Sequence, residues 1–439
     1  MTHKCKTHFK LSMKNSLSPN LALANQLVEQ ARSIGILHNV ITNQKTDGKN
    51  ILINDKRVTY FGNCCYLGLE NDVRLKAAAI DAIERYGIQF SCSRTYARIP
   101  LYDEIEYLLG QIFEKPTIAA PTTTLAHMST VPVLMRRNDV IIIDQQAHSS
   151  MHNALAIAKE MGAQVEILRH NRMDMLESQL KKLSQQYERV WFMTDGIFSM
   201  FGDTAPLSTL WDFMNQYDNF YCYIDDAHGM SWTGQHGSGY TLSQIQFFHD
   251  KMVLVTSLAK GFGACGAAIV LPNEALKRLV LNTGATLRAS GPVQPATLGA
   301  MIASAKIHLS PEITEKQERL GKLMSYFNLT AKSLRLPLVH DNKTPIFFMG
   351  VGTPEIGGEI MLNMLKSGFL LNPSSFPSVS YKHTGLRAAL TTYHTEQDIF
   401  DMLNALSNHL KDVEKKVKTN ENDIFSASDN EFQNNKNMV

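Results

Sequence analysis

The chain has 439 residues, of which 44% are hydrophobic and 19% charged, and its formal net charge is +2. This composition is typical of a globular protein with more than one core, and a charge so close to neutral does not indicate a nucleic-acid partner. No apolar run reaches the roughly 18 residues that a membrane span requires, so we expect no such span.

The N-terminal segment and the cysteines predict a cytoplasmic protein. The first twenty residues, MTHKCKTHFKLSMKNSLSPN, are basic and polar and lack the apolar stretch of a secretory signal. The six cysteines form no C-x-x-C pair, and the adjacent Cys64 and Cys65 are not a metal motif by themselves. We therefore expect reduced thiols and no bound metal.

The first elements predicted along the chain are a helix over residues 20–35 and two short strands in residues 50–61, around a turn at Asn54 and Asp55. From about residue 70 to 275, helical segments such as DVRLKAAAIDAIERYG alternate with short apolar runs. These runs are TIAAP, DVIIID, AQVEILR, VWFMTD, FYCYIDD and KMVLVTS. The alternation is typical of repeated β–α units, so we predict an α/β fold with a mostly parallel central sheet.

The pattern changes after the segment ASGPVQPATLGAMIASAKI. Helices are followed there by TPIFFMGV, FLLNPSSFP and LRAALTTYH, which predict a smaller α+β domain over residues 296–412. Residues 413–439 are rich in Asn, Asp and Lys with few apolar anchors, and they predict a disordered tail. The large domain then spans residues 66–295, preceded by an N-terminal arm and helix over residues 1–65.

Polar side chains follow four of the predicted strands. His148 follows DVIIID, Ser199 follows VWFMTD, His228 follows FYCYID and Lys260 follows MVLVTS. A lone histidine or lysine in such a place is usually structural or solvated. Because ligands of parallel sheets bind beyond the carboxyl ends of the strands, four such residues together indicate one site.

The residue types at this site indicate pyridoxal phosphate. A lysine amine forms a Schiff base with the cofactor's aldehyde, an acidic side chain keeps the ring nitrogen protonated, and an imidazole stacks on the flat ring. Asp225, at the end of YCYID, suits the acidic role. Small residues around Lys260, in VTSLAKGFGACGAAI, leave room for the ring, and the hydroxyls of Thr256 and Ser257 are candidates to bind the phosphate.

Several segments resemble the α-oxoamine synthase family of fold-type I pyridoxal-phosphate enzymes. YIDDAHGMSWTGQHGSG resembles the motif D-[DE]-A-H-x-x-G-x-x-G-x-x-G-x-G of that family, and TSLAKGFGACGAA resembles its lysine segment. Further matches in the same order are YLGL, SR at 93–94, DQQAHSSMHNAL, TDGIFSMFGD and LRAALTTYHTEQDI. The resemblance covers roughly residues 20–412 and implies a fold with a large cofactor-binding domain and a smaller C-terminal domain.

The resemblance implies roles for the residues at the strand ends. Lys260 becomes the Schiff-base lysine and Asp225 the partner of the ring nitrogen. His148 stacks on the ring, and His228 binds its phenolic oxygen. Ser199 lies at the margin of the ring in the family.

Four further residues gain roles from the resemblance. Ser257 matches a phosphate-binding hydroxyl, with Thr256 as a second candidate. Ser290, in RASGPVQP, matches the segment that reaches the cofactor phosphate of a neighbouring subunit, which implies a homodimer. Arg387 matches the arginine that holds the amino-acid carboxylate, and a bidentate guanidinium suits this task.

The sequence also departs from the pattern of the family. Cys64 takes the place of an asparagine that helps to hold substrate, in the segment GNCCYLGL. Thr123 and Thr124, in TTTLAH, stand where the family often has G-[FY]-x-A-N beside the phosphate. Arg98 and Tyr102 replace a glycine and a histidine in SRTYARIPLY, so the acyl substrate is less well predicted than the cofactor.

The activity implied by the resemblance is a pyridoxal-phosphate-dependent acyl transfer. An amino acid condenses with an acyl thioester, on coenzyme A or on a carrier protein, and loss of CO₂ leaves an α-aminoketone. One alternative is an aminotransferase or aldolase on the same scaffold, which CO₂ release would distinguish. Another is a binding protein that has kept the fold and lost catalysis, which a failure to bind cofactor would indicate.

Overall fold

The computed structural model of the chain describes residues 18–419, apart from 44, 246, 342 and 377. Helix α14, Glu396–Thr419, continues past the predicted boundary at residue 412. The rest of the predicted tail, and the start of the predicted arm, lie outside the described residues.

A seven-stranded sheet forms the centre of the large domain in the described part of the chain, with the order β3-β9-β8-β7-β6-β4-β5. Strand β9 is antiparallel to both of its neighbours, and the other pairs are parallel. The predicted mostly parallel sheet is thus confirmed. The strands are β3 (Thr117–Ala120), β4 (Asp139–Asp144), β5 (Gln164–Leu168), β6 (Arg189–Asp195), β7 (Phe220–Asp225), β8 (Met252–Ser257) and β9 (Ala267–Val270).

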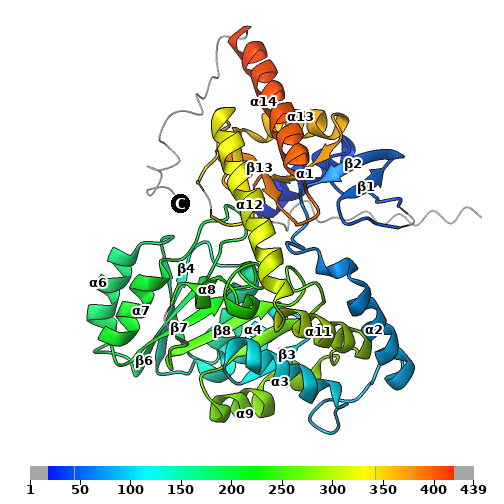
Figure 1. Cartoon of the computed structure of the whole chain (residues 1–439). Coiled ribbons are helices and arrows are strands. Elements are labelled where there is room, and N and C mark those ends of the chain that lie inside the picture. Colours follow the sequence, from blue (N-terminus) through cyan, green and yellow to red (C-terminus); the bar gives the residue numbers. More distant parts are fainter. Residues whose placement is uncertain (1–17, 44, 246, 342, 377, 420–439) are drawn as a thin grey trace, which may run out of the picture.

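Helices cover both faces of this sheet (Figure 1). Along β4, Ile142 packs into the core on one face, whereas Ile141 and Ile143 pack into the core on the other, because side chains alternate along a strand. The first face carries α2 (Val73–Tyr86), α3 (Leu101–Phe113), α6 (Met173–Leu183), α7 (Leu207–Gln216) and α11 (Pro295–His308). The second carries α4 (Thr123–Leu134), α5 (Ser149–Glu160), α9 (Glu274–Thr283) and α10 (Ala285–Ala289). Short helical turns are η2 (Leu69–Asn71), η3 (Gln235–Gly237), α8 (Tyr240–Ser243) and η4 (Tyr381–His383).

Helix α12, Glu312–Ser333, runs from the large domain into a smaller one (Figure 1). The smaller domain has an antiparallel sheet of order β10-β13-β12, and Phe327 of α12 stacks on Phe347 of this sheet. No helix among the described residues is long and apolar enough to cross a membrane. The remaining elements of this domain are β10 (Ile346–Gly352), α13 (Pro354–Lys366), β12 (Asn372–Ser374) and β13 (Thr384–Ala389), with α14.

The N-terminal segment consists of helix α1, Pro19–Ser33, and a hairpin that joins the smaller domain. The hairpin turns at Asn54 and Asp55, as predicted. Their φ values of 48° and 61° are the positive values that a tight two-residue hairpin turn requires. Its second strand pairs in parallel with a short strand of the C-terminal half. The strands are β1 (Asn50–Ile53), β2 (Lys56–Tyr60) and β11 (Phe369–Leu370).

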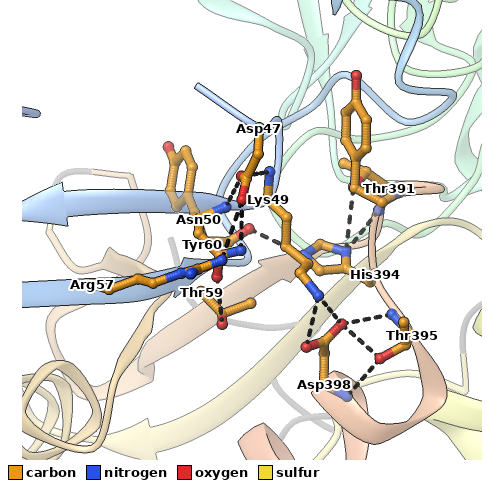
Figure 2. Close-up of polar contacts among 11 residues, drawn as sticks. Asp47, Lys49, Asn50, Arg57, Thr59, Tyr60, Thr391, His394, Thr395 and Asp398 are labelled. Carbon is orange, nitrogen blue, oxygen red and sulfur yellow. Dashed lines mark hydrogen bonds and ion pairs between the residues drawn. The ribbon is translucent and has the colours of Figure 1, made fainter. Parts of the chain in front are cut away.

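Polar contacts fix this hairpin to the start of α14 (Figure 2). The Lys49 ammonium lies 2.9 Å from an Asp398 carboxylate oxygen. His394 accepts the backbone N–H of Thr391 at Nδ1 and donates from Nε2 to the Tyr60 carbonyl at 3.1 Å, a pattern that needs a neutral ring. Burial lowers the pKa of His394 to about 4, in agreement with this pattern. These contacts hold the hairpin against the segment that joins β13 to α14.

Candidate active site

The carboxyl ends of the central strands enclose a cavity of about 170 Å³. Four residues predicted from the strand ends and motifs lie together on its wall: Lys260, Asp225, His148 and His228. The rest of the wall is formed by Thr122, Thr123, Thr124, Ser150, Asp195, Ile197 and Ala227. The structure thus brings the predicted lysine, carboxylate and imidazoles into one site.

Lys260 lies in the tight loop between β8 and β9. Its carbonyl accepts the N–H of Gly263 at 2.9 Å, and Gly263 has a φ of +78°, where a side chain would collide with Leu69. Burial lowers the pKa of Lys260, although Asp225 opposes this shift. No hydrogen bond or ion pair of its amine is found among the described residues. The loop therefore presents a buried, unpartnered amine to the cavity.

Asp225 receives a partner that the sequence did not predict. His127, in helix α4, places Nε2 2.9 Å from a carboxylate oxygen of Asp225 and Nδ1 2.9 Å from the Tyr223 hydroxyl. The other carboxylate oxygen accepts the N–H of Ala227 at 2.9 Å. Burial alone would raise the pKa of Asp225, but His127 and the lysine lower it below its ordinary value. Asp225 is thus held as a charged carboxylate.

A second buried carboxyl, Asp195, lies beside Asp225 at the end of β6. Burial and the Asp225 charge raise the pKa of Asp195 well above its ordinary value. Asp195 accepts the backbone N–H of His148 at 3.2 Å, and the His148 ring, whose pKa burial lowers, lies 2.7 Å from the Ser150 hydroxyl. The site therefore combines a carboxylate whose pKa is lowered, a carboxyl whose pKa is raised and an imidazole whose pKa is lowered.

His228 is buried beside Tyr66, a second residue that sequence reasoning left without a role. The Tyr66 hydroxyl lies 2.7 Å from Nδ1 of His228. Burial lowers the pKa of His228 well below its ordinary value. Tyr66 belongs to the quoted segment YLGL, but nothing in that segment shows that the ring reaches across to His228.

Arg387, in β13 of the smaller domain, is buried with 6% of its surface exposed. Its Nε donates to the carbonyl of Ser199 at 2.7 Å, and Nη2 lies 3.5 Å from the Cys64 sulfur. Ser199 thus contacts Arg387 through its backbone, and it is not among the residues that line the cavity. Cys64 thus stands next to the arginine.

The candidate phosphate-binding residues fall into two groups. Thr123 and Thr124 begin α4 at the cavity wall, where a helix N-terminus offers unpaired N–H groups. In contrast, Thr256 donates to the Asp226 carbonyl at 2.9 Å, and the Ser257 hydroxyl accepts the N–H of Ala259 at 3.1 Å. Neither Thr256 nor Ser257 is among the lining residues.

The remaining predicted residues lie away from the cavity of the same chain. Ser290, at the end of α10, donates to the Thr286 carbonyl at 2.5 Å. Tyr102, which replaces a family histidine, accepts the N–H of Val293 at 2.8 Å and is buried. Arg98 pairs with Asp103 at the surface. The described residues contain no group of three or more His, Cys, Asp or Glu side chains that would hold a metal ion.

Comparison with known proteins agrees with this geometry. Residues 58–416 match the model of the aminotransferase class I and II family. The chain belongs to that family. The 8-amino-7-oxononanoate synthases of Alkaliphilus metalliredigens and Fervidobacterium nodosum are 27% and 28% identical to it. The alignments cover 86% and 87% of this chain, and 94% and 95% of the relatives. The predicted likeness to α-oxoamine synthases, pyridoxal-phosphate-dependent C-acyltransferases, is confirmed.

Solved structures confirm the predicted fold-type I architecture. Serine palmitoyltransferase from S. paucimobilis, solved with bound PLP–myriocin, has a TM-score of 0.82 at 19% identity, covering 90% of this chain and 99% of that chain. An 8-amino-7-oxononanoate synthase from Francisella tularensis has a TM-score of 0.67 at 20% identity, covering 82% and 99%.

The cavity fits pyridoxal phosphate, the cofactor of the family. Lys260 supplies an unpartnered buried amine, and Asp225 supplies a charged carboxylate. The first turn of α4, at Thr123, offers N–H groups for a phosphate. Each part of the cofactor thus has a matching group on the cavity wall.

We expect His127→Leu to weaken cofactor binding by about tenfold or more, because the Asp225 carboxylate would lose a charge-assisted hydrogen bond. Titration of the apoprotein with pyridoxal phosphate, followed by absorbance, measures the dissociation constant. His127→Gln, which keeps one donor, should have a smaller effect. Equal affinity in His127→Leu and the wild type would show that His127 does not support Asp225.

Proposed function

We propose that this chain condenses an amino acid with an acyl thioester to give an α-aminoketone, CO₂ and a free thiol. The observation that carries this proposal is the buried Arg387 beside the cavity of Lys260. Its charge is close enough to lower the pKa of both Lys260 and His228. A carboxylate anchor next to an unpartnered amine suits an amino-acid substrate.

Each residue then has a defined task. When bound, pyridoxal phosphate supplies an aldehyde for covalent attachment of amines and a ring that withdraws electrons. Lys260 would hold this aldehyde and, once released by the substrate, take the proton from the substrate α-carbon. Asp225 would keep the ring nitrogen protonated, and His148 would stack on the ring. His228 would donate to the phenolic oxygen.

Arg387 would orient the substrate. A guanidinium that grips the carboxylate fixes which bond of the α-carbon stands perpendicular to the ring, and orientation of this kind is a large part of catalysis. The Ser199 carbonyl at 2.7 Å holds the guanidinium in place. The Cys64 thiol offers a weaker contact than an amide would.

The choice of acyl condensation over transamination rests on the similarity to the two named synthases and to serine palmitoyltransferase. Incubation of the purified holoenzyme with pooled amino acids and acyl thioesters of coenzyme A and carrier protein, followed by mass spectrometry, tests it. We expect a product whose mass is that of the amino acid plus that of the free acid of the acyl chain, less CO₂ and water. Formation of 2-oxo acids alone would indicate an aminotransferase.

We also propose a homodimer, in which Ser290 reaches the cofactor phosphate of the partner. Sedimentation of the holoenzyme should give twice the mass of the chain, 49.2 kDa. In addition, Ser290→Ala should weaken pyridoxal-phosphate binding, whereas Ser310→Ala, at another half-buried helix end, should not. A fully active monomer would refute the shared site.

A further inference from the structure

A cluster of charged residues lies beside the active site and has no role in the proposed reaction. His170, in the turn after β5, places Nδ1 2.9 Å from a carboxylate oxygen of Asp144 and Nε2 2.7 Å from one of Asp203. Both partners can only accept hydrogen bonds when ionised, so both bonds form only if each ring nitrogen carries a proton. The geometry is therefore that of an imidazolium between two carboxylates.

The two carboxylates belong to different segments beside the active site. Asp144 ends β4, four residues before His148. Asp203 belongs to the Ser199 hairpin, which we define as residues 197–204. In this hairpin Ile197 pairs with Thr204, and the N–H of Phe198 donates to the Asp203 carbonyl at 2.9 Å. His170 thus joins the base of the hairpin to the strand that precedes His148.

The tip of the Ser199 hairpin contacts the smaller domain. The Ser199 carbonyl accepts Nε of Arg387, and Thr344 donates to the Gly202 carbonyl at 2.8 Å. Further back, Ile197 lines the cavity. A displacement at the base of the hairpin would therefore also move the Ser199 carbonyl, which orients Arg387.

We propose that His170, in its charged form, is a positioning residue for the amino-acid carboxylate site. It fixes the Ser199 hairpin at its base and so keeps the Ser199 carbonyl on the Arg387 guanidinium. This proposal rests on the proposed function, in which Arg387 binds the substrate carboxylate.

The surroundings of His170 support a retained charge. Burial lowers the pKa of His170, but Asp144 and Asp203 raise it more strongly, to about 9. From α5, His152 faces Asp144, and burial lowers the pKa of His152, so it brings no competing charge. In the same turn, Asn171 donates its N–H to Asp144 at 2.9 Å and its side chain to the Thr204 carbonyl at 3.1 Å, and its amide nitrogen lies 3.3 Å from Nε2 of His170. Arg172 pairs with Asp174.

The sign of the pH dependence follows from the raised pKa. A histidine has an ordinary pKa near 6.5. The ion pairs of His170 with Asp144 and Asp203 therefore contribute fully below that pH and are lost as the pH rises through about 9. His170→Gln keeps one donor and no charge. We expect its amino-acid KM to exceed that of the wild type by about tenfold at pH 6.5, with kcat and the thioester KM unchanged. The ratio of the two KM values should fall towards one above pH 9, because titrations of substrate and cofactor cancel in this ratio.

Hydrogen exchange gives a readout that does not need the reaction. The amides of residues 197–204 should exchange faster in His170→Gln than in the wild type at pH 6.5, and equally at pH 10. His409→Gln, which alters a half-buried histidine of α14 bonded to Ser367, is the matched control and should change neither exchange nor KM. Asp203→Asn removes the charge without changing shape and should reproduce the effects if His170→Gln fails to fold.

A double variant separates positioning from a general structural effect. On the background of Arg387→Ala, His170→Gln should not raise the amino-acid KM further, because the two changes act through one contact. If the Ser199 hairpin exchanged faster in His170→Gln but no condensation product formed in the wild type, the proposed function would be refuted. The role of His170 in holding the hairpin would still stand. A KM ratio that is independent of pH, or unchanged hairpin exchange, would overturn the role of His170.

Discussion

Replacing Lys260 with alanine is expected to lower the rate of the proposed condensation by about 10⁴-fold or more, since both the covalent attachment point and the proton acceptor are lost. No other lysine is found among the described residues that line the cavity, so none can replace Lys260. Borohydride treatment of the wild-type holoenzyme should fix the cofactor to the peptide that contains Lys260, and peptide mapping of the variant should find no fixed cofactor.

Lys76→Ala provides the matched control, since Lys76 lies on the exposed side of α2 near Asn71. It should retain both activity and the fixed cofactor. Attachment of the cofactor to any other peptide in the wild type would show that the loop between β8 and β9 does not carry the reactive amine. Folding of the Lys260→Ala protein is checked by its thermal transition, which should remain cooperative.

The second large effect is expected at Arg387. Arg387→Ala should raise the amino-acid KM by about 100-fold, because charge-assisted hydrogen bonds to the carboxylate are lost and each contributes about 1.5–3 kcal/mol. Cys64→Asn should change the same KM by about tenfold or less, since one neutral hydrogen bond contributes only about 0.5–1.5 kcal/mol. Steady-state kinetics with varied amino acid measure both.

Cofactor affinity separates these effects from damage to the cavity. Neither Arg387 nor Cys64 is among the residues that line it, so both variants should bind pyridoxal phosphate as the wild type does. If Arg387→Ala left the amino-acid KM unchanged, the carboxylate would bind elsewhere. The role carried over from the C-terminal motif would then be wrong.

Much of the sheet was predictable because parallel strands are buried on both faces and appear as continuous apolar runs. Runs such as DVIIID and KMVLVTS therefore indicated β4 and β8 directly. The antiparallel β9, AAIV, was not distinguished, because its short alanine-rich sequence follows the glycines of the lysine loop without a helix between them. The hairpin at residues 50–60 was predicted from its turn, but its pairing with β11 is a long-range contact that no local pattern reveals.

The site shows the same difference between residues that a local pattern predicts and contacts that only the fold creates. Lys260 and Asp225 were predictable because Lys260 follows β8 and Asp225 ends β7, and the carboxyl ends of parallel strands meet at one edge of the sheet. His127 approaches Asp225 from a helix almost a hundred residues earlier in the chain, and Tyr66 approaches His228 from the N-terminal segment. The contact of Ser199 with Arg387 runs through its carbonyl, and backbone groups have no signature in the sequence.

The fate of the amino-acid carboxyl group tests the central claim most directly. The holoenzyme would be incubated with an acyl thioester and with L-serine, L-alanine or glycine, each labelled with ¹³C at the carboxyl carbon, and the headspace gas and products analysed by mass spectrometry. Acyl condensation predicts that the label leaves as ¹³CO₂ in a one-to-one ratio with an unlabelled α-aminoketone and with free thiol. Retention of the label in a 2-oxo acid, with no ¹³CO₂ above the level of the Lys260→Ala variant, would contradict it.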